Sequence, residues 1–207
     1  RLGAGVSLPT NTVVLNGGQY IVSTLTPGDV IIATNTILTP DAQLWDGQLT
    51  INPGVTVTNP GITDLLGYTP TNFVSNRVVF KDDSKLVVTD GFTIGANKGI
   101  VLETNTVTFQ VNTNDLIVQS PISGAGMLRK TGAGHIHMFG SNSYTGGTYI
   151  EQGWFGITND SGLGATSGKV TLAGGVLEGG FDASPTPLLV TIASNRVVEM
   201  RWTPKFG

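Results

Sequence analysis

Residues 130–153 read KTGAGHIHMFGSNSYTGGTYIEQG, a stretch in which glycines surround two short segments of alternating side chains. In HIHM, Ile136 and Met138 point to one side of an extended chain and the two histidines to the other, because successive side chains of a strand alternate between faces. TYI at 148–150 repeats the alternation. The intervening GSNSYTGG is rich in residues that tolerate left-handed backbone angles or bond nearby amides, as tight turns require. The stretch predicts a strand, a corner and a second strand.

The composition favours strands and turns. The chain has 207 residues, with 29 Gly, 28 Thr, 10 Pro and no Cys. Residues of this kind form helices poorly, so we expect helix to be a minor component. Without cysteine, disulfides and thiolate metal sites are excluded. The formal net charge is -3 and no basic cluster stands out, which argues against nucleic acid as a partner.

Membrane insertion is not expected. The longest purely aliphatic run spans residues 30–33, whereas a membrane-spanning helix needs about 20 apolar residues. The chain starts at Arg1 without Met and without a signal-like segment. We therefore expect it to be a piece of a longer polypeptide.

The spacing of strand-sized segments indicates a solenoid. Gly, Pro, Asn or Asp separates such segments about every ten residues. In TVTFQV at 106–111, the apolar side chains share one face and the polar ones the other, so one face is buried. SNRVVF begins at Ser75 and SNRVVEM at Ser194, which suggests that a unit starts again. Short, unequal strands and Gly-rich turns favour stacked rungs over a sandwich, with about six rungs after residue 73.

We divide the chain into three parts: an N-terminal β region at 1–61, a short helical turn or linker at 62–72, and a parallel β-helix at 73–207. The middle part reads TDLLGYTPTN from residue 63. Its Thr and Asp can cap a helical turn, the leucines give an apolar side, and Gly and Pro end it. The predicted fold class is all-β, a right-handed parallel β-helix with an additional N-terminal β region.

Residues 75–200 resemble the autotransporter-associated β-strand repeat. The resemblance is carried by ISGAGMLRKTGAGHIHMFGSNSYTGGTYIEQG at 122–153, GITNDSGLG at 156–164 and VTLAGGVLEGG at 170–180. In that repeat an SGAG precedes a strand, and KTGAG and YTGGT turn the chain. This sequence departs from the pattern by placing two histidines at outward positions usually held by small hydroxylic residues. The resemblance implies a right-handed parallel β-helix of the kind found in passengers of secreted bacterial proteins.

ITDLLGYTPTNFV at 62–74 resembles a segment of bacteriophage tail-fibre proteins that contains LGYTP. It covers about a dozen residues and implies a turn between fibre segments. Phage fibres of this kind are typically homotrimers, so the resemblance also implies that the chain assembles with two further copies of itself.

His135 and His137 are the first candidates for a metal site. Both imidazoles leave the same strand face, and three copies around a trimer axis could supply six nitrogens to an octahedral ion. Such HxH pairs are known in trimeric phage fibres. Two exposed histidines on an outer rung face are the more frequent outcome of so short a pattern. We therefore predict no metal site and no cofactor.

Carboxylates are the next candidates, because tailspike β-helices cleave glycans with Asp and Glu residues set across a groove. Asp82 and Asp83 lie in KDDSK between two strands, which indicates a solvated turn. Asp41 and Asp46 flank Trp45, whose ring could stack on a sugar, although packing is the more frequent role of such an aromatic. Four other acidic residues fall near predicted corners: Glu151, Asp160, Glu178 and Asp182. We predict no catalytic residue and no enzymatic activity.

Two glycine motifs, SGAG at 123–126 and TGAG at 131–134, superficially resemble phosphate loops. Neither opens a helix, which phosphate binding requires. We interpret them as corners where glycine avoids Cβ clashes at positive φ. Five asparagines are candidates for side-chain ladders along the coil: Asn97, Asn105, Asn112, Asn114 and Asn142.

These observations predict a non-catalytic structural or adhesive segment of an exterior virion fibre or tailspike-like phage protein, acting as a stiff spacer or host-attachment element. The alternatives are a passenger segment of a bacterial autotransporter adhesin, at the cell surface or secreted, and a glycan-degrading tailspike. Expected partners are other copies in a homotrimer, other virion proteins, and a host-surface glycan or protein. Binding would use outer faces and corner loops.

Overall fold

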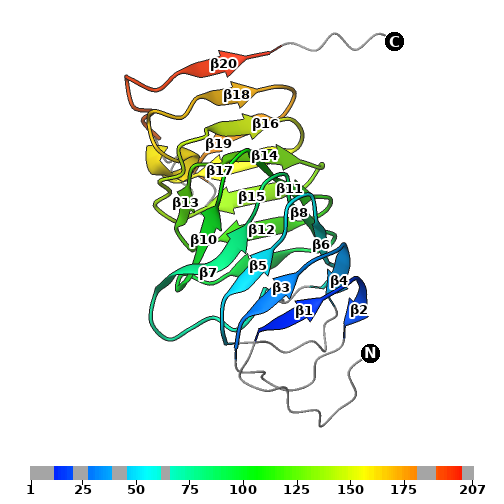
Figure 1. The fold of residues 1–207 in the computed structure, drawn as a ribbon. Coiled ribbons are helices and arrows are strands. Elements are labelled where there is room, and N and C mark those ends of the chain that lie inside the picture. Colours follow the sequence, from blue (N-terminus) through cyan, green and yellow to red (C-terminus); the bar gives the residue numbers. More distant parts are fainter. Residues whose placement is uncertain (1–11, 21–27, 39–45, 62–65, 181–189, 202–207) are drawn as a thin grey trace, which may run out of the picture.

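The computed structural model describes residues 12–20, 28–38, 46–61, 66–180 and 190–201. The regular structure of these residues is almost entirely β, with one short 3-10 helix, η1 (Asp160–Leu163). The strands stack into an elongated coil, with the N-terminal strands at one end and the C-terminal strands at the other (Figure 1). No helix among the described residues is long and apolar enough to span a membrane.

Three parallel sheets form the sides of the coil. Sheet A contains six described strands: β1 (Val13–Leu15), β3 (Val30–Ile32), β5 (Leu49–Ile51), β7 (Val74–Phe80), β10 (Lys98–Leu102) and β13 (Ile122–Gly124). Sheet B contains nine: β2 (Gly18–Tyr20), β4 (Thr36–Leu38), β6 (Thr56–Asn59), β8 (Lys85–Val88), β11 (Thr106–Val111), β14 (Met127–Thr131), β16 (Thr148–Ile150), β18 (Val170–Leu172) and β20 (Val198–Met200). Sheet C contains five: β9 (Phe92–Ile94), β12 (Asp115–Val118), β15 (His135–Met138), β17 (Trp154–Ile157) and β19 (Val176–Gly179).

Each strand pairs in parallel with strands from the preceding and following rungs rather than with its neighbour in sequence. In sheet B, Val107 lies beside Leu128, and Leu128 lies beside Thr148. The predicted parallel β-helix is therefore confirmed. About six rungs were expected after residue 73, and six strands of sheet B follow that residue: β8, β11, β14, β16, β18 and β20.

Sheets A and B continue across the segment at 62–72. Leu49 of β5 pairs with Val78 of β7, and Val57 of β6 pairs with Leu86 of β8. The strands before residue 61 and after residue 73 thus share hydrogen-bonded sheets, while their division into domains stays a prediction. The expected helical turn is absent from residues 66–72, which form bends and irregular chain, and its first part lies outside the described residues.

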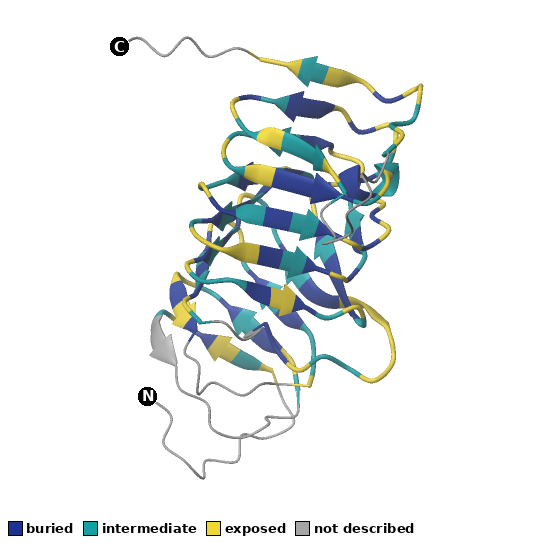
Figure 2. Cartoon of the chain, turned by 180° about the vertical axis from the view of Figure 1, so that it is seen from behind, coloured by how far each residue is buried: buried dark blue, intermediate teal, exposed yellow. Residues whose placement is uncertain are grey.

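The core is a column of apolar side chains contributed by alternate positions of all three sheets. Ile136, Phe109 and Ile150 are fully buried, and Met138 is 1% exposed. Buried positions alternate with partly exposed ones along β11 and β15, and Figure 2 shows buried segments beside more exposed ones on the strands of the coil. The predicted inward direction of Ile136 and Met138 is therefore confirmed, and His135 and His137 face outward.

Two glycines from the predicted corners have the positive φ that the corners require. Gly124 has φ 111° and Gly132 has φ 78°. A Cβ atom would lie 1.9 Å from the carbonyl oxygen of Leu102 at Gly124, and 2.2 Å from that of Val111 at Gly132. Glycine is needed there because a neighbouring rung passes so closely.

The asparagines do not stack on one another as predicted. Asn105 donates a hydrogen bond to Asp82, and Asn114 donates one to Asp90 of the preceding rung. Asn142 is buried, and its side chain bonds the main chain of two other rungs. Asn97 donates to the main-chain carbonyls of residues 70–71, and Asn112 accepts a hydrogen bond from the Gln110 side chain. For Asn105 and Asn114, the corresponding corner of the preceding rung carries Asp instead of Asn, so the side chains pair without forming an asparagine ladder.

Candidate functional site

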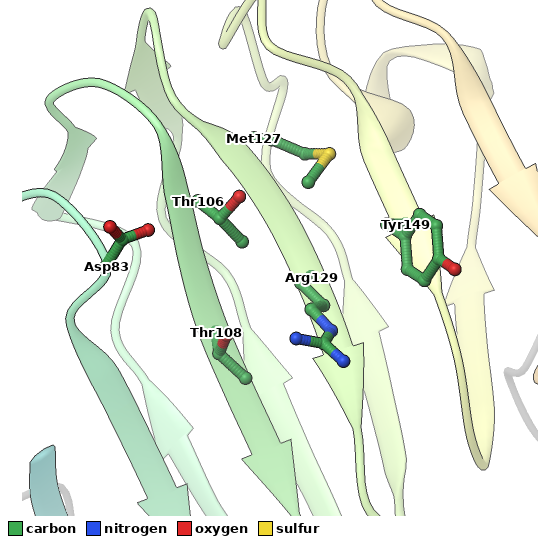
Figure 3. Close-up of a pocket in the computed structure, with 6 residues that line it drawn as sticks. All are labelled: Asp83, Thr106, Thr108, Met127, Arg129 and Tyr149. Atoms are coloured by element: carbon green, nitrogen blue, oxygen red, sulfur yellow. The ribbon is translucent and has the colours of Figure 1, made fainter. Parts of the chain in front are cut away.

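A groove of about 430 Å³ lies on the outward face of sheet B (Figure 3). Its lining consists of six side chains: Asp83, Thr106, Thr108, Met127, Arg129 and Tyr149. They come from the corner before β8 and from β11, β14 and β16. Because parallel strands in register place equivalent positions side by side, the outward residues of three successive rungs form one continuous surface.

Arg129 is the only cationic side chain among the groove's lining residues. Its Nε donates to Oε2 of Glu151 at 2.7 Å, and its guanidinium carbon lies 6.0 Å from the ring centre of Tyr149. These contacts orient the guanidinium while leaving the side chain 41% exposed. An oriented guanidinium beside an aromatic ring and threonine hydroxyls is suited to binding polar or anionic groups.

The acidic residues considered from the sequence lie in different environments. Asp83 is exposed and lines the groove, whereas Asp82 accepts hydrogen bonds from Thr104 and Asn105. Glu151 is paired with Arg129. The others have separate surroundings: Asp46 accepts from Gly28, Asp160 pairs with Arg196, and Glu178 is half-buried on β19. Asp41, Trp45 and Asp182 lie outside the described residues. Asp83 is the one carboxylate among the groove's lining residues, so that lining shows no carboxylate pair across the groove.

The predicted histidine pair gains a third member that the sequence did not reveal. Asp115 is in register with His135 across β12 and β15. Its Oδ1 lies 3.0 Å from Nδ1 of His135, and its Oδ2 lies 3.4 Å from Nε2 of His137. The Trp154 ring meets the His135 ring edge-on, with ring centres 5.5 Å apart. The missing signal was the register, which brings together residues 20 positions apart in sequence.

Several buried polar groups hold the coil together instead of facing a ligand. Lys130 is fully buried between Phe109 and Ile150, its neighbours in register. Its ammonium donates to three main-chain carbonyls, and burial lowers its pKa to about 8. Burial also raises the pKa of Tyr144, whose hydroxyl lies 2.7 Å from that of Thr148.

Part of the chain is similar to a known adhesin. A region of 106 residues is 36% identical to the Adhesin BmaC autotransporter of Brucella suis biovar 1 (strain 1330). The region covers 51% of this chain and 3% of that protein, so the chain spans a small fraction of the relative's length. No protein-family model matches the chain. No solved structure matches it either.

The adhesin similarity and the parallel coil together fit a β-helix repeat of the autotransporter type. The resemblance of residues 62–74 to phage tail fibres gains no support from these comparisons. The virion fibre therefore remains a sequence-based hypothesis, while the alternative of an adhesin passenger is supported.

Proposed function

We propose that this chain is a non-catalytic, structural and adhesive segment in the passenger of a bacterial autotransporter adhesin, located at the cell surface. The 36% identity to a named autotransporter adhesin over half of the chain carries the proposal. The parallel coil agrees with it, because a solenoid can extend by adding rungs while keeping one continuous core.

The mechanical part of this function follows from the direction of the hydrogen bonds. Strands pair with the rungs above and below, so main-chain hydrogen bonds run along the coil axis on all three sides. Apolar side chains fill the interior from Leu15 to Val170. A rod built in this way resists bending. Because few backbone groups inside the coil are unpaired, it should also resist proteolysis. It can hold outward-facing side chains away from the bacterial surface.

The adhesive part is assigned to the groove on sheet B. Arg129 and Tyr149 project from neighbouring rungs, with the hydroxyls of Thr106 and Thr108 beside them. Such a surface suits a host-surface glycan or protein that presents carboxylate, sulfate or hydroxyl groups. Because the groove lies on strands held in register by the coil, its side chains need little ordering on binding.

Adhesion can be tested with fluorescent beads coated with the purified 207-residue chain. The beads should bind mammalian cells, and Arg129→Ala and Tyr149→Ala should each reduce the bound fraction several-fold. Thr93→Ala is the matched control, since Thr93 is exposed on the outward face of sheet C. Failure of the unmodified chain to bind would overturn the adhesive assignment. An equal loss of bead binding in all three variants would show that the groove is not the surface that contacts the cells.

The oligomeric state separates this proposal from the virion fibre. An autotransporter passenger is expected to be a monomer, whereas the fibre hypothesis requires a homotrimer. The mass of the purified chain by light scattering should therefore be that of one chain, 21.6 kDa. A stable mass three times larger would favour the fibre and argue against the passenger.

A further inference from the structure

Three potential metal ligands meet on the outward face of sheet C, away from the groove. They are the carboxylate of Asp115 and the imidazoles of His135 and His137, and one ligand atom from each lies within 4.8 Å of the other two. The two oxygens of Asp115 face different histidines, at 3.0 Å and 3.4 Å. One carboxylate therefore joins two imidazoles from the adjacent rung.

The backbone fixes this arrangement. Parallel pairing places Asp115 directly beside His135, about 4.8 Å away across the sheet. Strand alternation places His137 on the same outward face, two residues further along. The three side chains therefore stay together as long as β12 and β15 remain paired, and no loop has to close around them.

The distances suit a shared ion. Zn²⁺ binds imidazole nitrogen and carboxylate oxygen at about 2.0–2.2 Å, which puts neighbouring ligands of a tetrahedral site about 3.3 Å apart. The separations of 3.0 Å and 3.4 Å from the carboxylate oxygens to the imidazole nitrogens lie close to that value. These two distances belong to different oxygens of Asp115, and one ligand atom from each residue lies within 4.8 Å of the other two. Small rotations of the three side chains would bring one atom from each to the spacing of a shared ion.

The side chains around this cluster favour a cation and limit the movement of the histidine rings. The His137 side chain is only 12% exposed, and Trp154 packs edge-on against His135, so both rings have limited freedom. His135 and Asp115 are 41% and 49% exposed, which leaves a side open for water as a further ligand. The outward positions of the described strands of sheet C include Glu178 but no Lys or Arg. Among these described strand positions, no positive side chain would oppose an ion.

We propose that Asp115, His135 and His137 bind one divalent transition ion, with Zn²⁺ as the best match. Two imidazoles and one carboxylate suit Zn²⁺, Cu²⁺ or Ni²⁺, whereas Ca²⁺ and Mg²⁺ prefer oxygen ligands alone. The bound ion links β12 to β15 and strengthens the side-chain connection that Asp115 already makes to the two histidines. The proposal does not depend on adhesion.

The test is calorimetric titration of the full chain, free of any affinity tag, with ZnCl₂ alone. One Zn²⁺ should bind per chain, and the melting temperature should rise with Zn²⁺ concentration because the ion binds the folded state. Asp115→Asn and His137→Thr should each weaken binding about tenfold or more. Glu178→Gln is the control, since it removes a carboxylate from the same face outside the cluster, and its affinity should match that of the unmodified chain.

A second titration with CaCl₂ separates a histidine site from general attraction of cations. Ca²⁺ should neither bind at this site nor raise the melting temperature. No Zn²⁺ binding by the unmodified chain, or equal binding by all three variants, would overturn the proposal. Equal effects of Ca²⁺ and Zn²⁺ would overturn it as well. Circular dichroism identifies any variant that fails to fold. If one of the two ligand variants does not fold, the Zn²⁺ affinity of the other tests the proposal.

Discussion

Arg196 and Asp160 form a two-point ion pair that attaches the last described rung to the coil. Nε of Arg196 lies 2.7 Å from Oδ1 of Asp160, and its Nη2 lies 2.9 Å from Oδ2. The same guanidinium donates to main-chain carbonyls within residues 163–168, and the Arg196 side chain is fully buried. The Arg196 hydrogen bond also holds the pKa of Asp160 below its usual range. One side chain thus ties the approach to β20 to the corner around η1.

Asp160→Asn should loosen the end of the coil. The substitution leaves a buried guanidinium without its counter-charge, which typically costs about 3 kcal/mol or more. Because solenoids open from their ends, the loss should appear as faster hydrogen exchange at the amides of Val198–Met200. Exchange at β12, which lies several rungs away, should stay unchanged.

The control for this prediction is Glu199→Gln. Glu199 pairs with Lys169 and Arg201, but these pairs are exposed and exposed ion pairs contribute little. Exchange in β20 should therefore match that of the unmodified chain. Equal loosening by Glu199→Gln and Asp160→Asn would show that the buried pair has no special role in holding the last rung.

Much of the fold is predictable because it depends on local patterns. Alternation alone places Ile136 and Met138 in the core and the histidines outside, since the period of a strand fixes which faces its side chains occupy. Gly124 and Gly132 are recognisable as corners because only glycine readily combines positive φ with a close neighbouring chain. Neither inference requires knowledge of which strands become neighbours.

The candidate sites depend on register, which local patterns do not contain. Asp115 meets His135 only because the rung between them has a particular length. The repeated SNRVV motif illustrates the difficulty, since its two copies enter different sheets, β7 in sheet A and β20 in sheet B. What the copies share is a buried arginine, Arg77 or Arg196, that donates to main-chain carbonyls. The groove was missed for the same reason, because Arg129 and Tyr149 come from separate rungs.

The lowered pKa of Lys130 predicts that the folded chain becomes more stable at alkaline pH. Its pKa falls from 10.5 to about 8 in the folded chain, so the unfolded chain binds more protons between these values. The free energy of unfolding should therefore rise by about 2 kcal/mol between about pH 8 and pH 10.5. Urea denaturation across this range measures the rise. Lys130→Met removes the titrating group, and a slope unchanged by that substitution would contradict the assignment to Lys130.

Met138→Asp should strongly destabilise the coil, whereas His137→Thr should change its stability little, although the two residues are adjacent. Met138 is 1% exposed between Val118 and Ile157, so a carboxylate there loses its hydration without gaining a partner. We expect a loss of about 4 kcal/mol or more, enough to unfold this part of the coil. His137→Thr, measured without added metal, should change stability by less than about 1 kcal/mol. Similar thermal melts for the two variants would contradict the assigned directions of these side chains.

Two glycine substitutions separate backbone strain from steric contact. Gly54 has φ 69°, and a Cβ added there would have no atom within 4 Å, so Gly54→Ala should cost only the left-handed strain of about 1–2 kcal/mol. Gly124 has φ 111°, and a Cβ there would lie 1.9 Å from the carbonyl oxygen of Leu102 in the preceding rung. Gly124→Ala must therefore push two rungs apart, and we expect it to cost at least about 3 kcal/mol in urea denaturation. Equal losses would mean that the rungs separate without cost, which is incompatible with a coil held together by close rung-to-rung hydrogen bonds.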